Sequence, residues 1–304
     1  MMKNHFDFTP TPLTRIQSIS AEYNCNFFMK RDDLLEHGGG GSKARMLQYI
    51  LFRAASEGAD YILTAGGPYS NFNRALALLC AKYQFKMRLV LYDKNQHINK
   101  MSLNRRVLDF CDVEIVDCNP ENVVNMIEEQ KKELINKGHT PYYVWGGGKS
   151  KEGVEAYRDC FKEIIMEKET DYVFTAVGTG TTFTGLATSP NRNKETEIIG
   201  ISVARSKEIC DEVISGIMKE CGIDKNCDLA NTKILDNYLL GGYGISNEEL
   251  DSFIQNFTIR EGVIVDKIYV GKALYGTLKH LDKIQEKILN KNIVFLNTGG
   301  LYNF

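Results

Sequence analysis

Short apolar segments alternate with helical patterns through most of the chain, and this alternation limits the fold more than any other feature. At least one helical pattern separates each predicted strand from the next, the strands being 26–30, 61–64, 87–92, 113–117, 142–145, 172–177, 197–203 and 293–296. Strands joined through helices lie parallel and need cover on both faces. The sequence therefore predicts an α/β fold with mostly parallel sheets flanked by helices.

Glycine-rich turns follow four of these strands, at 65–67, 146–148, 178–180 and 299–300. In open α/β sheets, ligands bind beyond the carboxyl ends of the strands, and glycines there let the backbone approach a ligand closely. We therefore expect the four turns to line one cleft.

A run of four glycines, 38–41, leads through Ser42 into Lys43 and then into a helical pattern. Ser42 is a good N-cap, so Lys43 is predicted to lie in the first turn of a helix. A lysine held in such a place can lose contact with water, lower its pKa and act as a nucleophile toward a carbonyl group. The same residues would also suit a mobile surface loop, so this stretch alone leaves both interpretations open.

The strand at 172–177 runs into the sequence GTGTT, and a helical pattern follows it. Backbone N–H groups at such a helix start form an anion site, and threonine hydroxyls add donors. A dinucleotide fingerprint fits poorly, because the glycines fall at 178, 180 and 185 rather than in the G-x-G-x-x-G spacing. The next strand also supplies no acidic residue for a ribose. The loop therefore predicts a site for a single phosphate group, with a purely structural turn as the alternative.

A lysine suited to a Schiff base, a phosphate loop and several glycine-tipped strands together indicate pyridoxal 5′-phosphate. From about residue 9 to residue 300 the chain carries, in order, the motifs TPLTRI, FMKRDDL, GGGGSKAR, TAGGPYSNFNRALA, WGGGKSKEG, AVGTGTTFTGL, LGGYGI, IYVGKALYG and NTGGL. In this ordered set the chain resembles the D-cysteine desulfhydrase and 1-aminocyclopropane-1-carboxylate deaminase family, within the tryptophan-synthase-β-like, fold type II pyridoxal-phosphate enzymes.

The resemblance implies two domains, each with a mostly parallel twisted sheet flanked by helices, and the cofactor in the cleft between them. Residues 1–53 and 161–304 would form the larger domain, which anchors the cofactor. Residues 54–160 would form the smaller domain on the substrate side. The resemblance also favours a homodimer.

Roles for individual residues follow from the same resemblance. The implied catalytic residues are Lys43, which holds the cofactor as a Schiff base, Ser70 and Tyr269. The implied cofactor contacts are Asn71 at the ring 3′-oxygen, Gly178, Thr179, Gly180, Thr181 and Thr182 at the phosphate, and Thr298 at the ring edge. The substrate side is implied to include Tyr69, Ser70, Phe72 and Tyr269. Structural roles stay open beside these, since Ser70 and Asn71 would also cap a helix and Tyr269 would suit a packed strand end.

Four positions depart from the family pattern. Ser42 replaces an asparagine, Tyr69 replaces a glutamine, and Phe72 replaces a histidine or glutamine. Val270 stands where the deaminases place a glutamate that keeps the pyridine nitrogen protonated. We therefore expect Thr298 to be the only partner of that nitrogen, which suits β-elimination or β-replacement better than the opening of a cyclopropane ring. The resemblance thus does not fix the substrate.

The resemblance implies a pyridoxal-phosphate-dependent lyase or deaminase that acts on a small amino acid, D-configured or L-configured. Removal of the Cα proton and loss of a β-substituent would release a 2-oxo acid and ammonia, as in a D-cysteine desulfhydrase. Either Lys43 or Ser70 is the candidate base. Open alternatives are a β-replacement enzyme or racemase of a biosynthetic pathway and a non-catalytic relative, while the glycine spacing disfavours a dinucleotide-dependent oxidoreductase.

Composition restricts the partners and the compartment. The 304 residues carry a formal net charge of −2, which gives no reason to expect nucleic acid or an anionic membrane, and no apolar run reaches the length of a membrane span. Neither the five histidines nor the eight cysteines show a metal-ligand spacing, so no metal site is predicted. Because the N-terminus lacks a signal-peptide pattern, we expect reduced thiols in a cytoplasmic protein.

Overall fold

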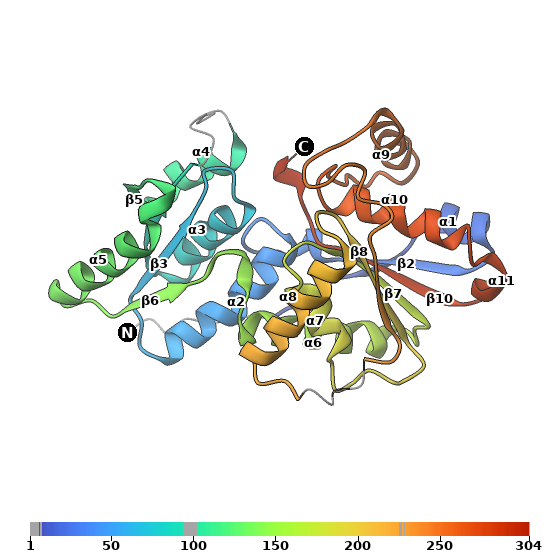
Figure 1. Cartoon of the computed structure of the whole chain (residues 1–304), viewed down its shortest axis with the longest axis horizontal. Helices are drawn as coiled ribbons and strands as arrows, with labels where there is room; N and C mark the ends of the chain where they lie inside the picture. Colours follow the sequence, from blue (N-terminus) through green and yellow to red (C-terminus); the bar gives the residue numbers. More distant parts are fainter. Residues whose placement is uncertain (1–5, 7, 94–101, 225–226, 228, 304) are drawn as a thin grey trace.

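Two sheets form the cores of two lobes in the computed structural model, which describes residues 6, 8–93, 102–224, 227 and 229–303 (Figure 1). The larger sheet has the strand order β1 (Leu13–Arg15), β2 (Asn26–Arg31), β10 (Asn292–Asn297), β7 (Tyr172–Val177), β8 (Glu197–Ser202) and β9 (Thr232–Leu235). The smaller sheet has the order β5 (Glu114–Asp117), β4 (Lys86–Leu91), β3 (Tyr61–Gly66) and β6 (Pro141–Val144). Every neighbouring pair is parallel except β1 and β2, so the predicted fold class is confirmed.

Helices cover both faces of the larger sheet, because its strands bury side chains on both sides. Ile293 and Phe295 of β10 pack into a core on one face, which is covered by α1 (Gln17–Tyr23), α9 (Glu248–Glu261) and α10 (Val270–Leu281). Val294 and Leu296 alternate with them and pack on the other face, which is covered by α6 (Lys151–Glu167), α7 (Thr181–Ala187) and α8 (Lys207–Glu220). The period-two alternation along a strand thus separates two cores.

The smaller sheet is covered in the same way. One face carries α2 (Gly41–Ser56), α3 (Asn71–Tyr83) and α4 (Leu103–Phe110). The other face carries α5 (Val123–Asn136), whose Ile127 packs against β3 and β4. The remaining short helices are η1 (Asp32–Leu34), η2 (Pro120–Asn122), η3 (Gly146–Gly148), α11 (Gln285–Ile288) and η4 (Leu301–Asn303).

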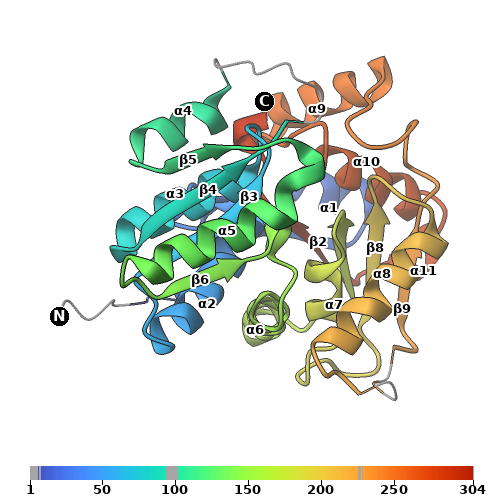
Figure 2. The ribbon, with the colours of Figure 1, turned by 60° about the vertical axis from the view of Figure 1, so that its left-hand side comes forward.

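Two helices connect the lobes. α2 leads from β2 toward β3, and α6 leads from β6 back to β7. They pack against each other, and Figure 2 shows α6 nearly end-on between the lobes. The strands of the smaller sheet all come from the middle of the chain. We propose the domain boundaries 1–53 with 161–304 and 54–160, which fall within the two connecting helices α2 and α6.

The sequence pattern did not predict β1 and β9, which are the two edges of the larger sheet. With three residues, β1 is too short for a period-two pattern to stand out, and β9 has four residues. Across the described residues, no helix combines the length and apolar character that crossing a membrane requires.

Candidate active site

A cleft of about 540 Å³ opens between the lobes at the carboxyl ends of their strands. All four glycine-rich turns contribute to its walls, through Gly67 after β3, Gly147 after β6, Gly178 and Gly180 after β7, and Gly299 and Gly300 after β10. The prediction that these turns line one cleft is therefore confirmed. Among the residues expected at a site, all but Thr181 line this cleft.

The glycine run sets the position of Lys43. Helix α2 has Gly40 as its N-cap residue, and a Cβ at Gly40 would lie 2.3 Å from a backbone oxygen of η1, so only glycine fits there. The prediction that Ser42 caps the helix is wrong, because Ser42 lies inside α2 and its N–H donates to the carbonyl oxygen of Thr298 at 2.9 Å. Lys43 still lies in the first turn, since the helix begins just before it.

The amine of Lys43 is directed across the cleft. Its Nζ donates to the carbonyl oxygen of Gly147 at 2.9 Å, which joins α2 to the turn after β6. Burial lowers the pKa of Lys43 from its ordinary value to about 8, because the charged form loses water. A substantial fraction of this amine is therefore neutral near physiological pH, as a nucleophile toward a carbonyl requires.

The loop after β7 presents backbone donors to the same cleft. Gly180 has a φ of +87° and is the N-cap residue of α7. Within the described residues, the N–H groups of 179–182 donate to no protein acceptor. The guanidinium of Arg205 lines the cleft beside this loop and donates to the carbonyl oxygen of Gly178 at 2.7 Å. Free N–H groups and a nearby cation suit an anion such as a phosphate.

Thr181 differs from its neighbours in this loop. Its side chain is fully buried behind the cleft, where a Cβ at Gly153 of α6 would lie 3.2 Å from its Cγ2 atom. Its Oγ1 has no hydrogen-bond partner within the described residues. Thr179 and Thr182 do line the cleft. A ligand in the cleft therefore meets the hydroxyls of Thr179 and Thr182, whereas Thr181 can offer it only the backbone N–H.

The smaller lobe contributes the start of α3. Ser70 is the N-cap residue, and its Oγ accepts from the N–H of Asn73 at 3.2 Å. The Oδ1 of Asn71 accepts from Nδ2 of Asn104 at 3.1 Å, which fixes the direction of the Asn71 amide. Ser70 thus caps the helix, as the structural interpretation expected, and also faces the cleft. The half-exposed Tyr69 and the buried Phe72 line the same wall.

Two tyrosine side chains meet on the opposite wall. The hydroxyls of Tyr243 and Tyr269 lie 2.9 Å apart, and their rings contact edge to face at 5.8 Å between centroids. Burial and the hydrogen bond to Tyr243 raise the pKa of Tyr269, so its hydroxyl stays protonated. The sequence interpretation missed Tyr243 as a site residue, although it lies in the motif LGGYGI, which helped to carry the resemblance.

The turn after β10 brings Thr298 into the cleft close to α2. A Cβ at Gly299 would lie 2.8 Å from the Cα of Gly41, so the two backbones are in direct contact. Val270 is fully buried and does not line the cleft. Thr298 lines the cleft at this turn, and its role as partner of the ring nitrogen stays a prediction.

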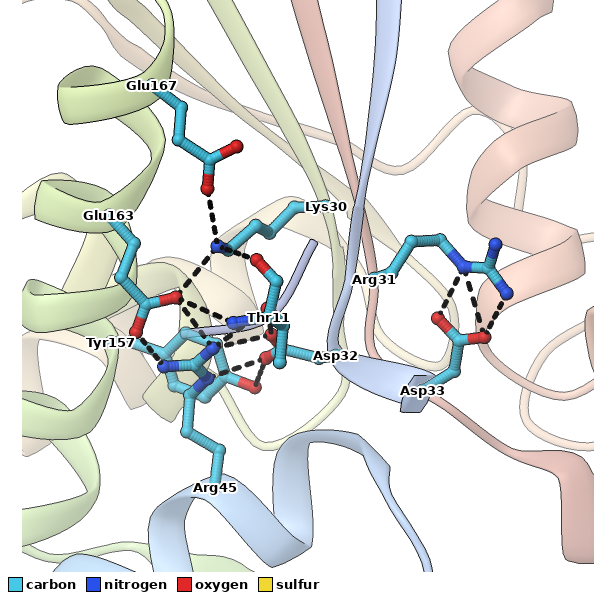
Figure 3. A network of polar contacts seen from close by, with 9 residues as sticks. All are labelled: Thr11, Lys30, Arg31, Asp32, Asp33, Arg45, Tyr157, Glu163 and Glu167. Atoms are coloured by element: carbon cyan, nitrogen blue, oxygen red, sulfur yellow. Dashed lines mark hydrogen bonds and ion pairs between the residues drawn. The ribbon is translucent and has the colours of Figure 1, made fainter. Parts of the chain in front are cut away.

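A buried network of charges anchors the start of α2 behind Lys43 (Figure 3). The guanidinium of Arg45 donates to Asp32 of η1 at 2.9 Å and to Glu163 of α6 at 2.6 Å. Lys30 of β2 pairs with Glu163 at 2.8 Å, and Tyr157 of α6 donates to Asp32 at 2.9 Å. The network thus joins the larger sheet to both helices that connect the lobes.

These residues fit pyridoxal phosphate by the chemistry of their donors. A buried amine with a lowered pKa suits the aldehyde, unpaired backbone N–H groups at 179–182 suit the phosphate, and the hydroxyl of Thr298 suits the ring edge. All three lie on the walls of one cleft.

Comparisons with known proteins agree with this fit. The family described as "Pyridoxal-phosphate dependent enzyme" matches residues 6–299. A Pyrococcus horikoshii protein named "Putative 1-aminocyclopropane-1-carboxylate deaminase" is 32% identical over 305 residues, covering 96% of this chain and 89% of that protein. The D-cysteine desulfhydrase of Yersinia pestis is 30% identical over 302 residues, covering 95% of this chain and 91% of that protein.

A solved structure shows the same architecture. It is described as a crystal structure of an ACC deaminase homologue, and it matches with a TM-score of 0.81 and 29% sequence identity. The match covers 98% of this chain and 91% of that chain. Given the family match over nearly the whole length and the geometry of the cleft, this chain belongs to the family of pyridoxal-phosphate dependent enzymes.

Proposed function

We propose that this protein is a pyridoxal-phosphate-dependent lyase or deaminase that removes the Cα proton of a small amino acid and eliminates its β-substituent. The products would be a 2-oxo acid and ammonia. The observation that carries the proposal is the amine of Lys43, which combines a pKa lowered to about 8 with a fixed place in the cleft beside the phosphate loop. The names of the relatives, a deaminase and a desulfhydrase, support the same class of reaction.

The cofactor supplies an aldehyde that condenses with amines and a conjugated ring that withdraws electrons from the Cα of an attached amino acid. Lys43 has two tasks beside it. Its neutral amine would hold the cofactor, and the same amine, when free, would accept the proton from Cα. A pKa of about 8 suits the second task, because a base works best when its pKa lies near the operating pH.

The start of α3 suits the carboxylate of the substrate. The N–H groups of Asn71 and Phe72 donate to no acceptor within the described residues, and they lie at the positive end of the helix dipole. A carboxylate there would place Cα toward the cleft interior, near Ser70. Ser70 is the alternative base, and the protonated hydroxyl of Tyr269 is the candidate donor for a leaving group or for Cβ.

The test begins with the visible absorbance of the purified protein, followed by borohydride reduction and peptide mapping. We expect the added cofactor mass on the peptide that contains Lys43. Lys43→Ala should lose both the absorbance and turnover, whereas Lys279→Ala, at an exposed site on α10, should keep them. Cofactor mass on another lysine, or full turnover by Lys43→Ala, would end the proposal.

A panel of D- and L-amino acids then separates the reaction types. Release of a 2-oxo acid and ammonia supports elimination. Exchange of the Cα proton without such release would instead support a racemase, and incorporation of an added nucleophile would support β-replacement. Homodimer formation and a cytoplasmic location stay predictions from the sequence.

A further inference from the structure

Lys272 is a fully buried lysine that the proposed chemistry does not use. Its side chain has no solvent exposure and pairs with no carboxylate within the described residues. Burial also lowers the pKa of Lys272, because the charged form loses water there. A buried amine of this kind costs free energy unless hydrogen bonds compensate for the lost water.

The helix makes the position less favourable still. Lys272 is the third residue of α10, which spans Val270–Leu281, so its charge lies at the positive end of the helix dipole. Asp266 offsets part of this cost, because its carboxylate accepts from the N–H of Tyr269 at 2.7 Å and from the N–H of Val270 at 3.1 Å. A methionine has a similar length and would avoid both the burial of a charge and its unfavourable place in the helix dipole. The hydrogen bonds that Lys272 makes therefore explain why a lysine stands at this position.

Both hydrogen bonds of Lys272 go to one surface loop. Its Nζ donates to the carbonyl oxygen of Leu239 at 2.9 Å and to that of Gly242 at 2.7 Å. Tyr243 follows directly in the chain and is 61% exposed. The loop thus carries a cleft residue but buries little of its own surface.

The loop has few backbone hydrogen bonds of its own within the described residues. The N–H of Gly242 donates to the carbonyl oxygen of Leu239 at 3.0 Å, and the N–H of Ile245 donates to that of Gly242 at 3.4 Å. Four of its residues have positive φ, namely Leu240, Gly241, Gly242 and Gly244. Glycines adopt such angles easily but leave many other conformations open, so an unanchored loop of this composition would sample many shapes. The ammonium of Lys272 adds two hydrogen bonds that tie the loop to the buried start of α10.

Lys272 and Tyr269 belong to the same turn of the chain. Tyr269 is the N-cap residue of α10, three positions before Lys272. The anchored loop brings the Tyr243 hydroxyl to 2.9 Å from the Tyr269 hydroxyl. The first turn of α10 thus presents Tyr269 directly, and it positions Tyr243 through the loop that Lys272 binds.

We propose that Lys272 is a positioning residue, which holds the loop 239–244 so that Tyr243 and Tyr269 form a single hydroxyl pair on the cleft wall. The inference rests on the proposed function in one respect, because Tyr269 is proposed there to act on the substrate. The placement of the loop by Lys272 does not depend on the reaction.

The first experiment measures hydrogen exchange of the holoenzyme in the segment 239–244. Lys272→Met should speed exchange in this segment, and Lys272→Gln, which keeps one amide donor group, should give an intermediate rate. The control is Lys279→Met on the same helix, since Lys279 is about half exposed and contacts Glu249 and the ring of Tyr275 rather than the loop. Exchange in 239–244 that is unchanged in both Lys272 variants would overturn the inference, whatever the enzyme's reaction.

The second experiment is a double-mutant cycle in the amino-acid turnover assay. Lys272→Met and Tyr243→Phe should each lower kcat by about tenfold to a hundredfold, and the double variant should be no slower than Tyr243→Phe alone. The visible absorbance of the bound cofactor should remain in all three. Multiplied losses in the double variant would show that Lys272 affects turnover independently of Tyr243 and would also overturn the inference. If Lys272→Met does not fold, Lys272→Gln takes its place in the cycle.

Discussion

At the scale of single residues, Lys43 owes its chemistry to its surroundings more than to its sequence neighbours. Burial lowers its pKa from 10.5 to about 8, while the hydrogen bond to the carbonyl of Gly147 fixes its direction. An ordinary surface lysine would be almost fully protonated at neutral pH. The local environment thus supplies the neutral amine that an attack on an aldehyde needs.

Capture of pyridoxal phosphate by the apo protein should therefore depend on pH through the Lys43 amine. Only the neutral form attacks, so the second-order rate constant should rise with pH and level off above about 8. Stopped-flow absorbance at a series of pH values measures this rate. A rate that keeps rising toward pH 10.5, the ordinary pKa of lysine, would contradict the environment assigned to Lys43.

The role of Thr298 as the partner of the ring nitrogen can be tested by a single substitution. The Thr298 hydroxyl is offered to the cleft at the turn after β10, while Val270 is buried and apolar and can offer no hydrogen bond. Thr298→Val keeps the shape and removes one hydrogen bond, so turnover should fall by about tenfold and the visible absorbance of the cofactor should shift. Thr14→Val on the exposed edge strand β1 should change neither. An unchanged spectrum together with unchanged turnover would exclude Thr298 as the partner of the ring nitrogen.

At the scale of elements, the start of α2 is held from behind by charge. Arg45 bridges Asp32 of η1 and Glu163 of α6, and all three are at least mostly buried (Figure 3). A buried pair contributes little net stability compared with apolar packing, but removing one partner leaves the others uncompensated. The network therefore makes the position of Lys43 depend on both helices that connect the lobes.

Arg45→Met should lower the free energy of unfolding by about 3–5 kcal/mol, because Asp32 and Glu163 would stay buried without their cation. Urea unfolding followed by circular dichroism measures the loss. The matched control is Arg53→Met on the same helix, whose ion pair with Glu57 is exposed and should contribute less than about 1 kcal/mol. Equal losses in the free energy of unfolding of the two variants would refute the larger contribution assigned to the buried network.

The elements also show which features the sequence could predict. The central strands and the glycine turns at their ends follow from local patterns, and these predicted the fold class and the cleft. Ser42 was wrongly predicted as a cap, because the approach of the chain to η1 and Thr298 decides where α2 begins. Tyr243 and Lys272 were not singled out as site residues, since their roles depend on a contact between a loop and a helix that are about 30 residues apart.

At the scale of the whole molecule, the cleft is a shared surface. Ser70 and Asn71 come from the smaller lobe, whereas the loop 178–182 and Thr298 come from the larger lobe. Lys43 lies on α2, one of the two helices between them. A ligand that contacts all of these groups stabilises the arrangement of the lobes as well as each lobe separately.

Reconstitution with pyridoxal phosphate should therefore protect both lobes together. Binding to the native state alone should add about 2.7 kcal/mol of stability at a ligand concentration of one hundred times Kd. Hydrogen exchange should slow at 67–72 in the smaller lobe as well as at 178–182 in the larger lobe, because both ranges line the cleft. Pyridoxine 5′-phosphate, which has the phosphate but no aldehyde, is the control and should protect 178–182 with less effect on the first turn of α2. Protection confined to the larger lobe would mean that the smaller lobe closes on the substrate alone, and the cofactor contact assigned to Asn71 would be wrong.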